Sequence, residues 1–220
     1  MFSKWHKIDF HIHTDKSRET KDNDYQGVFS IDKLLEKLLE NEVELFSLTD
    51  HNIVNENAYK ELSTKNINFL VGIELDIAIS DSELEEYITK IDSGANAEKI
   101  NIKPFHIIVL FKSNDFMKIS KKLEKMYTTI SVNTLKNKID LCAKKKLRVT
   151  TFEMLATTFI EDDYFIIAHG NKNKGIVKPY KEANLLQEAQ YEILFGEISA
   201  LEMKSHINMI HVIGIYNPVC

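Results

Sequence analysis

The chain has 220 residues, of which 44% are hydrophobic and 28% are charged, a composition that fits a soluble globular protein and excludes disorder over the whole length. Its 7 glycines and 3 prolines exclude collagen-like and linker-rich classes. The net charge of −5 disfavours a protein dedicated to duplex DNA.

Cysteine content and the lack of a long apolar run predict where the protein works. The two cysteines, Cys142 and Cys220, are too few for a disulfide framework or a cysteine-rich zinc site, and they suit the reducing cytosol. No apolar run approaches the ~18 residues of a membrane-spanning helix, and the first residues lack the apolar stretch of a signal peptide. We therefore expect a cytoplasmic protein with no membrane partner.

Short apolar runs alternate with amphipathic stretches in the first third of the chain. From Ile31 to Leu39, apolar residues recur at i, i+3, i+4, i+7 and i+8, which predicts a helix with one apolar face. Ser30 precedes this helix as a plausible N-cap. Strands are predicted around it at 8–12, 44–49 and 69–75, and a short second helix is predicted at 58–65.

The remainder of the chain continues this alternation after a polar interval. Residues 80–103 are polar and contain a loop signal at 92–96, so we expect a loop there. The strongest strand of the chain follows at 105–111. The other elements predicted are helices at 114–127, 133–146 and 182–195, and strands at 149–152, 164–168, 198–203 and 209–216.

Strands buried on both faces and separated by helices predict parallel α/β architecture. Seven or eight such units, with histidines recurring at strand ends, favour a barrel over a two-layer sheet, and we expect 1–220 to form a single domain. The run 105–111 is an exception, because His106 lies at its start. That position fits a strand returning antiparallel from a hairpin after 75–80.

Histidines gather at the ends of the predicted strands. Of the eight histidines, five lie within or just after hydrophobic runs: His11, His13, His51, His106 and His169. A single histidine in such a place is more often a hydrogen-bonded core residue. Five histidines at successive strand ends are not well explained in that way. Because the carboxyl ends of barrel strands meet at one mouth, these imidazoles would share one cavity, as the ligands of a divalent metal site do.

Three local motifs make the metal site more specific. In His11-Ile12-His13, residues i and i+2 of an extended strand share a face, so both rings can reach one ion. His51 ends the next strand. Glu74 lies inside an apolar strand, where a buried carboxylate is costly without a cation. The alternative for Glu74 is a salt bridge to a lysine.

In this order the motifs resemble the PHP family, named for its polymerase-associated and histidinol-phosphatase members. The resemblance covers roughly residues 7–204 and implies a distorted (β/α)7 barrel that holds two or three divalent ions, usually Mn, Zn or Fe. It implies that His11 and His13 bind the first ion and that Glu74 bridges two ions. It also implies that His106 and His169 bind the other ion of the pair that Glu74 bridges. His51 would bind the remaining ion.

Acidic and basic residues complete the expected site. The family often adds a ligand shortly after its His-x-His, and Asp24 is the best candidate, with Asp22 and Asp15 as alternatives. Asp50 is expected to orient the ring of His51 or of another ligand from behind. The catalytic set would therefore be Glu74, Asp50 and His51. After His169, the lysines at 172 and 174 either contact substrate phosphate or remain solvated, the latter being the more ordinary outcome.

One element of the family pattern is missing. The pattern ends in Asp-x-His on the last strand, whereas this chain has no aspartate after Asp163. His206, which follows Lys204 by two positions, is a candidate substitute for the histidine alone. Either the first ion at His11 and His13 is bound weakly, or the chain is truncated or altered at its C-terminal end.

The chemistry implied is metal-assisted phosphoester hydrolysis, in which bound ions lower the pKa of a water to about 7. Nucleotides, nucleic-acid ends and small phosphomonoesters are the candidate substrates. Residues 4–14 and 196–205 are similar to PHP domains of bacterial ATPase-linked proteins, so a nuclease module of a genome-defence protein is an alternative. With no Walker motif in the chain, the ATPase would be another domain or subunit. A degenerate metal-binding scaffold is the third hypothesis, and amidohydrolases fit Glu74 less well.

Overall fold

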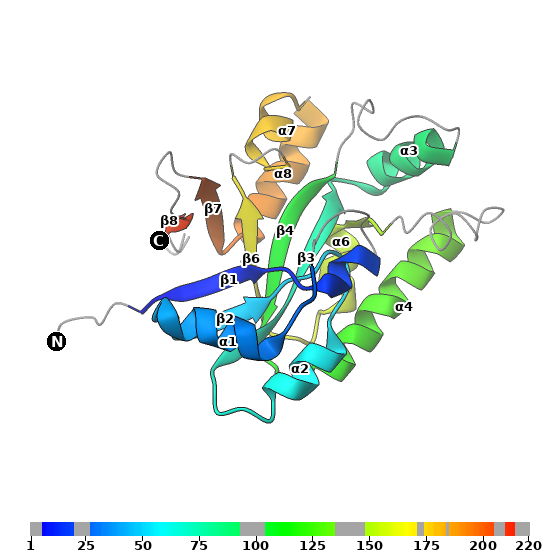
Figure 1. The fold of residues 1–220 in the computed structure, drawn as a ribbon. Coiled ribbons are helices and arrows are strands. Elements are labelled where there is room, and N and C mark those ends of the chain that lie inside the picture. Colours follow the sequence, from blue (N-terminus) through cyan, green and yellow to red (C-terminus); the bar gives the residue numbers. More distant parts are fainter. Residues whose placement is uncertain are drawn as a thin grey trace.

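The computed structural model describes residues 6–19, 27–92, 104–134, 148–170, 174–183, 185–204 and 210–213. Their strands form one eight-stranded mixed sheet that curls like half a barrel (Figure 1). The strands are β1 (Ile8–Ile12), β2 (Leu45–Leu48), β3 (Phe69–Ala78), β4 (Phe105–Phe111), β5 (Thr150–Thr151), β6 (Tyr164–His169), β7 (Ala200–Lys204) and β8 (Ile210–Ile213).

The sheet runs in the order β1-β2-β3-β4-β6-β7-β8, with β5 beside β3. The pairs β1/β2, β2/β3, β3/β5 and β6/β7 are parallel, whereas β4 is antiparallel to both β3 and β6. The antiparallel course predicted for 105–111 is therefore confirmed. The expected (β/α)7 barrel is not confirmed, because in the part of the chain described here β1 and β8 are opposite edges of an open sheet.

Helices connect the strands and carry local signals for their starts. They are α1 (Ile31–Glu40), α2 (Glu56–Leu62), α3 (Asp81–Asp92), α4 (Phe116–Thr134), α6 (Phe152–Thr158), α7 (Val177–Lys181) and α8 (Leu185–Glu197), with a 3-10 turn η1 (Asp15–Glu19). The predicted cap of α1 is confirmed, since the side chain of Ser30 accepts a hydrogen bond from the backbone N–H of Lys33. No helix in the described ranges is long and apolar enough to span a membrane.

Three predictions about helices were wrong. The loop expected at 80–103 begins as helix α3, because the Oγ of Ser80 accepts the N–H of Glu83 and Leu84 is buried beneath the first turn. Helix α4 continues to Thr134 past the predicted break, and the second helix expected at 133–146 otherwise lies outside the described residues. In α1 the apolar face is narrower than predicted, since Leu39 is 81% exposed.

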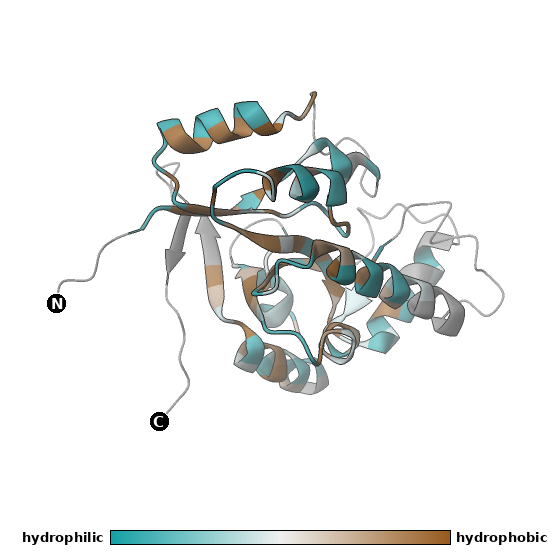
Figure 2. Cartoon of the chain, turned by 90° about the horizontal axis from the view of Figure 1, so that it is seen from below, coloured by the Kyte–Doolittle hydropathy of each residue, from teal (hydrophilic) through white to brown (hydrophobic). Residues whose placement is uncertain are grey.

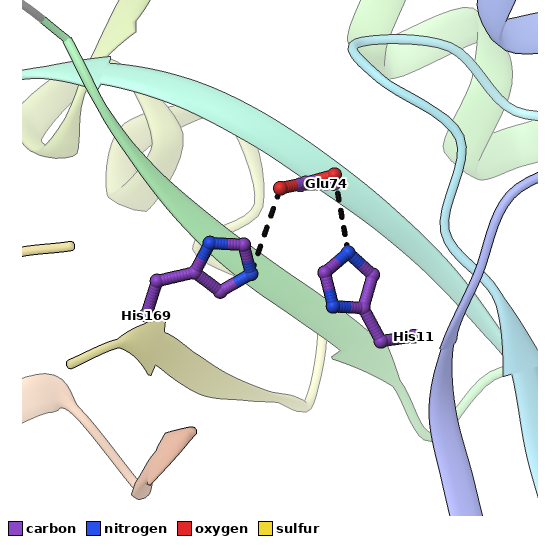
Figure 3. A group of neighbouring side chains, drawn as sticks. All are labelled: His11, Glu74 and His169. Carbon is purple, nitrogen blue, oxygen red and sulfur yellow. Dashed lines mark hydrogen bonds and ion pairs between the residues drawn. The ribbon is translucent and has the colours of Figure 1, made fainter. Parts of the chain in front are cut away.

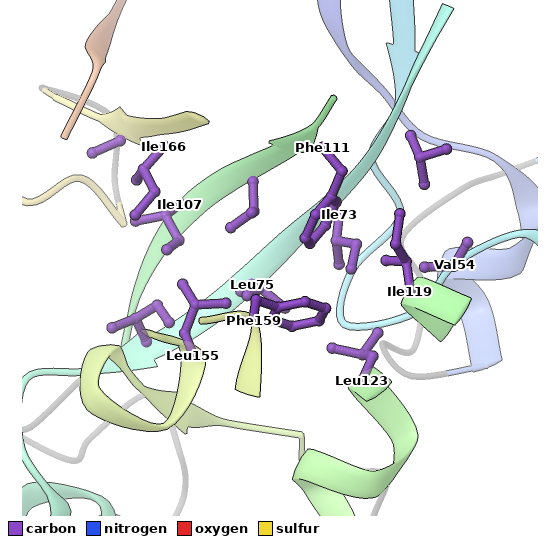
Figure 4. Packing of buried hydrophobic residues seen from close by; sticks show 14 of the residues in the cluster. Val54, Ile73, Leu75, Ile107, Phe111, Ile119, Leu123, Leu155, Phe159 and Ile166 are labelled. Atoms are coloured by element: carbon purple, nitrogen blue, oxygen red, sulfur yellow. The ribbon is translucent and has the colours of Figure 1, made fainter. Parts of the chain in front are cut away.

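One face of the sheet, here called the outer face, is covered by the helices. Strand β3 contributes alternate residues from Val71 to Ile77 to it, and β4 contributes Phe105 to Phe111 in the same alternation. Figure 4 shows Ile73 and Leu75 among side chains from α4 and α6 in this core. The helices are banded apolar and polar, as expected for elements with one side on a core (Figure 2).

The opposite, inner face of the sheet is the concave side and is much less apolar. Its small cluster consists of Ile108, Leu110, Ile167 and Ala200, with Phe10 and Leu70 packed against it. Gly72 lies on this face where space is short: a Cβ there would be 2.2 Å from Ser47 Oγ and 3.0 Å from Leu110 Cδ2. Glycine is therefore required for the close packing of β3 against β2 and β4.

A β-bulge in β1 decides which way the His-x-His motif points. Asp9 pairs with Phe46 and Ile12 pairs with Leu48, so β1 has one more residue than β2 over this interval. Accordingly Phe10 packs on the inner face, whereas Ile12 packs with the outer core. If the same residues formed a regular strand without the bulge, strict alternation would put the neighbours of Ile12 on the same side as Asp9. The bulge thus brings His11 and His13 to the inner face.

Candidate metal centre

Five histidines and one glutamate from five neighbouring strands meet on the inner face. They are His11 of β1, His13 just after it, His51 just after β2, Glu74 of β3, His106 of β4 and His169 at the end of β6. In sheet order these strands are adjacent, so each step across the sheet adds one ligand position. Figure 3 shows Glu74 between His169 and His11, which approach it from opposite sides.

The five imidazoles form a closed ring around the carboxylate. The centroid distances between neighbouring rings are 4.9 Å for His11–His13, 4.6 Å for His13–His51, 4.9 Å for His51–His106, 5.5 Å for His106–His169 and 4.9 Å for His11–His169. Such crowding of rings of one kind around one anion is typical of a ligand shell.

Both oxygens of Glu74 are used by imidazoles. Its Oε2 lies 3.1 Å from His13 Nε2, 3.1 Å from His51 Nδ1 and 3.4 Å from His11 Nε2. Its Oε1 lies 2.5 Å from His106 Nδ1 and 3.6 Å from His169 Nε2. The side chain of Glu74 is only 2% exposed. No lysine pairs with it among the described residues, so the alternative of a lysine salt bridge is not supported.

Burial and hydrogen bonding act in opposite directions on the central pair. Burial alone would raise the pKa of Glu74, but hydrogen bonds with His106, His11 and His13 outweigh it and hold that pKa well below its usual value. Burial would likewise lower the pKa of His106, but hydrogen bonds to Asp76 and Glu74 raise it. In the metal-free protein, the raised pKa of His106 therefore favours a positive charge on the ring beside Glu74.

The donor set fits divalent ions. Three groups each place one potential ligand atom per residue within 4.8 Å of one another: His11 with Glu74 and His169, His13 with His51 and Glu74, and His51 with Asp76 and His106. The predicted pairing of His11 with His13 is also compatible, since their Nε2 atoms are 3.0 Å apart. Imidazole nitrogen with carboxylate oxygen is a combination that suits Zn, Mn or Fe. Glu74 takes part in two groups, as a bridging ligand would.

Asp76 is the site residue that the sequence analysis missed. Its Oδ1 lies 3.0 Å from His106 Nε2 and its side chain is 14% exposed. The signal was present: Glu74 and Asp76 are i and i+2 on one strand, the same spacing as His11 and His13. The boundary predicted for the strand, residue 75, left Asp76 outside it.

Asp50 is connected through hydrogen bonds to the ring of His13, which is one of the expected ligand rings other than His51. Its carboxylate accepts hydrogen bonds from Thr14 N at 2.7 Å, Thr14 Oγ1 at 2.8 Å and Ser17 Oγ at 2.7 Å. The effect on a ligand is indirect, because Ser17 Oγ lies 3.2 Å from His13 Nδ1. Burial raises the pKa of Asp50, although the bonds from Thr14 and Ser17 oppose the shift.

The other expected site residues divide into those that the structure describes and those that it does not. Asp22, Asp24, Lys172 and His206 lie outside the described residues. Asp15 lines a surface hollow beside α2, and it belongs to none of the ligand groups found in the described ranges. Lys174 is 43% exposed, and its Nζ lies 3.6 Å from Asp76 Oδ1.

No family model and no curated protein matches the chain. Among solved structures, it is similar to a proposed metal-dependent phosphoesterase from Bifidobacterium adolescentis, with 12% identity, 90% of this chain and 77% of that chain covered, and a TM-score of 0.45. It is also similar to an amidohydrolase from Chromobacterium violaceum with bound sulfate and no metal, with 12% identity, coverage of 84% and 74%, and a TM-score of 0.44. Likenesses this distant do not establish what the chain does, and its function has to be inferred from its own side chains.

Proposed function

We propose that the protein is a metal-dependent hydrolase that cleaves phosphoesters. The observation that carries this proposal is the buried Glu74 carboxylate inside a closed ring of five imidazoles. A carboxylate with both oxygens directed at different histidines suits two neighbouring divalent ions better than one. Two-ion sites of this type serve hydrolysis of phosphoesters.

Each group of the chain has a separate task in this proposal. Glu74 would hold the ions, and His11, His13, His51, His106 and His169 would supply neutral nitrogen ligands around it. Bound divalent ions would supply an activated water with a pKa of about 7 and would neutralise charge on the phosphoryl oxygens. Asp50 holds Thr14 and Ser17, and through Ser17 it keeps the ring of His13 in place.

A phosphate-bearing substrate is supported by the positive charge of a lysine beside the centre. Lys174 is 43% exposed beside Asp76, so its ammonium can reach an anion bound at the ions. Small phosphomonoesters, nucleotides and nucleic-acid ends all carry such a group. We propose phosphoesters as the class and leave the choice among them to the assay below.

The test begins with metal-free protein, reconstituted separately with Mn²⁺, Zn²⁺ and Fe²⁺. Metal content is measured by mass spectrometry. Turnover is measured on p-nitrophenyl phosphate, on bis(p-nitrophenyl) phosphate, and on single-stranded and duplex DNA. We expect metal-dependent cleavage of at least one phosphoester, and loss of both turnover and at least one ion in Glu74→Gln. Glu44→Gln, whose side chain is 43% exposed just before β2, is the matched control.

The outcomes separate the competing functions. Cleavage confined to DNA would favour a nuclease module, for which an ATPase domain or subunit is a proposed partner. Full metal loading without any phosphoester turnover would contradict the proposal and favour a metal-binding scaffold, the hypothesis that the missing Asp-x-His also favours. Normal metal stoichiometry in Glu74→Gln would refute the bridging role of that residue.

A further inference from the structure

We infer that Asp76 is a positioning residue for His106: it accepts the proton on Nε2 and so leaves Nδ1 as the atom that binds an ion beside Glu74. The inference rests on the proposed metal centre and adds a residue that the five-histidine set does not include. His106 lies between two carboxylates, with Nδ1 2.5 Å from Glu74 Oε1 and Nε2 3.0 Å from Asp76 Oδ1. A neutral ligand ring keeps one proton, so one of these contacts must become the ligand side.

The two carboxylates differ in what surrounds them, and this difference selects the ligand side. Glu74 contacts four other imidazoles, so the space at its oxygens is where the nitrogen ligands converge. Asp76 is instead surrounded by donors. Its Oδ2 accepts a hydrogen bond from Asn52 Nδ2 at 2.7 Å, and Lys174 Nζ lies 3.6 Å from Oδ1. A ligand histidine commonly donates its other ring N–H to such a carboxylate.

Asp76 is held rigidly enough to impose this choice. Its backbone N–H donates to Asn52 Oδ1 at 3.0 Å, so side chain and backbone of Asp76 both bond to one amide. The same Asn52 Oδ1 accepts from the hydroxyl of Tyr127 on α4 at 2.8 Å, and Arg148 Nη1 donates to the carbonyl of Asn52 at 3.3 Å. Asn52 has φ of 56°, a left-handed conformation that asparagine tolerates. This conformation turns the amide back towards β3.

The ring of His13 follows the same rule, which supports the inference independently. The hydroxyl of Ser17 donates its single proton to Asp50 Oδ1 at 2.7 Å. Ser17 Oγ must therefore accept from His13 Nδ1, 3.2 Å away, which leaves His13 Nε2 as the ligand atom towards Glu74. In both rings, the nitrogen that faces away from Glu74 meets a hydrogen-bond acceptor.

The alternative is a third ion held by His51, Asp76 and His106, whose potential ligand atoms lie within 4.8 Å of one another. Because Asp76 Oδ1 lies 3.0 Å from His106 Nε2, an ion bound to Asp76 would take Nε2 as its His106 ligand. It would also lie close to Lys174, whose ammonium is already 3.6 Å from Asp76 Oδ1, so a second cation there is opposed by charge. The two readings thus assign different nitrogens of His106 to the metal.

Nitrogen NMR of zinc-loaded protein distinguishes these readings without an activity assay. In long-range ¹H–¹⁵N spectra of protein labelled at histidine, we expect His106 to show metal at Nδ1 and a proton at Nε2, with its signals assigned by their loss in His106→Gln. Coordination through Nε2 would overturn the inference while leaving the metal centre intact. Protein that binds no zinc in calorimetry would overturn the metal centre and the inference together.

Variants of Asp76 provide the second measurement. Asp76→Ala should weaken zinc binding at the Glu74–His106 position by about 10–100-fold and allow His106 to sample both tautomers, without lowering the number of ions at saturating zinc. Asp76→Asn retains an acceptor oxygen and should restore most of the affinity and the single tautomer. The control is Asp163→Asn, at a side chain that is 78% exposed. Loss of one whole equivalent of zinc at saturation in Asp76→Ala would overturn the positioning role in favour of a third ion.

Discussion

The two faces of strand β3 have opposite chemistry although their residues alternate along one stretch of chain. The outer face carries Val71, Ile73, Leu75 and Ile77, and the inner face carries Leu70, Gly72, Glu74 and Asp76. Every outer residue in this set has an exposed fraction of 0% and lies in the main core. The inner set includes a residue without a side chain and two carboxylates. The residues of β3 that form the core and those proposed to serve the metal centre therefore differ only in the face of the sheet to which their side chains point.

This separation means that the two faces should respond differently to substitution. Outer residues contribute by removing apolar surface from water, about 1.5–3 kcal/mol for a fully buried aliphatic side chain. Glu74 on the inner face is unfavourable to bury, and only the histidines around it offset that penalty. Changes on the outer face should lower the free energy of unfolding, whereas changes on the inner face should mainly alter metal binding.

The largest expected effect tests the outer face alone. Leu75→Ala removes a side chain with an exposed fraction of 0% from the main core and should lower the free energy of unfolding by about 2–5 kcal/mol. Urea unfolding followed by circular dichroism measures the change. The protein that remains folded should bind metal with the same stoichiometry as the wild type. Loss of metal in step with the loss of stability would show that the faces are not separable.

A smaller effect is expected at the one inner position where packing is tight. Gly72→Ala places a Cβ 2.2 Å from Ser47 Oγ, so β2 or β3 must shift. We expect a loss of about 1–3 kcal/mol in the free energy of unfolding, typical of overpacking. Gly196→Ala is the control, since a Cβ there has no atom within 4 Å. Equal stability of the two variants would show that the inner face has room to relax.

The inner face should also give the metal-free protein a characteristic pH dependence. The raised pKa of His106 contributes stability that is fully present below its usual 6.5 and is lost as pH rises through its folded-state pKa. The lowered pKa of Glu74 contributes stability that is present above its usual 4.5 and is lost as pH falls through its folded-state pKa. Both contributions are complete only between pH 4.5 and 6.5.

Thermal melting of metal-free protein tests this expectation. The wild type should lose melting temperature as pH rises above 6.5, and His106→Gln should lose less over the same range. His6→Gln, at a side chain that is 55% exposed, should behave like the wild type. Identical pH profiles for the wild type and His106→Gln would contradict the assigned hydrogen bonds.

The smallest effect concerns which leucines of α1 belong to the main core. On α1, Leu38 is 7% exposed in the main core, whereas Leu39 beside it is 81% exposed. Leu39→Gln should change the free energy of unfolding by no more than about 0.5 kcal/mol. Leu38→Ala should lower it by about 2 kcal/mol or more. A loss at Leu39 as large as that at Leu38 would point to a covered surface over α1.

Much of the fold could be predicted because the strands are strongly apolar and well separated. The run at 105–111 and the position of His106 at its start were enough to predict an antiparallel strand, and the cap at Ser30 was identified from residue type. Helix α3 was missed because its sequence is mostly polar and only Leu84 marks the buried side in its first turn. Closure of the sheet depends on how strands curl, which local patterns do not encode.

The convergence of the histidines could be predicted, but their hydrogen-bond partners could not. Strand ends brought His51, His106 and His169 to the same place as expected. The partner of Asp50 could not be foreseen, since it depends on the turn η1 bringing Ser17 back beneath the carboxylate. Asp76 was missed because the predicted strand ended at residue 75, which left its pairing with His106 on antiparallel β4 out of consideration. The metal-binding roles themselves remain predictions.

The bulge in β1 separates the direction of the His-x-His motif from that of the residues before it. Asp9 pairs with Phe46 and Ile12 pairs with Leu48, so a regular strand through the same residues from Asp9 onwards would turn both imidazoles towards the helices and away from Glu74. Removal of Phe10 would instead restore strict alternation with Ile12 still opposite Leu48, and both imidazoles would stay on the inner face. For this stretch we therefore expect the site to tolerate the loss of the extra residue, provided that Ile12 keeps its pairing with Leu48.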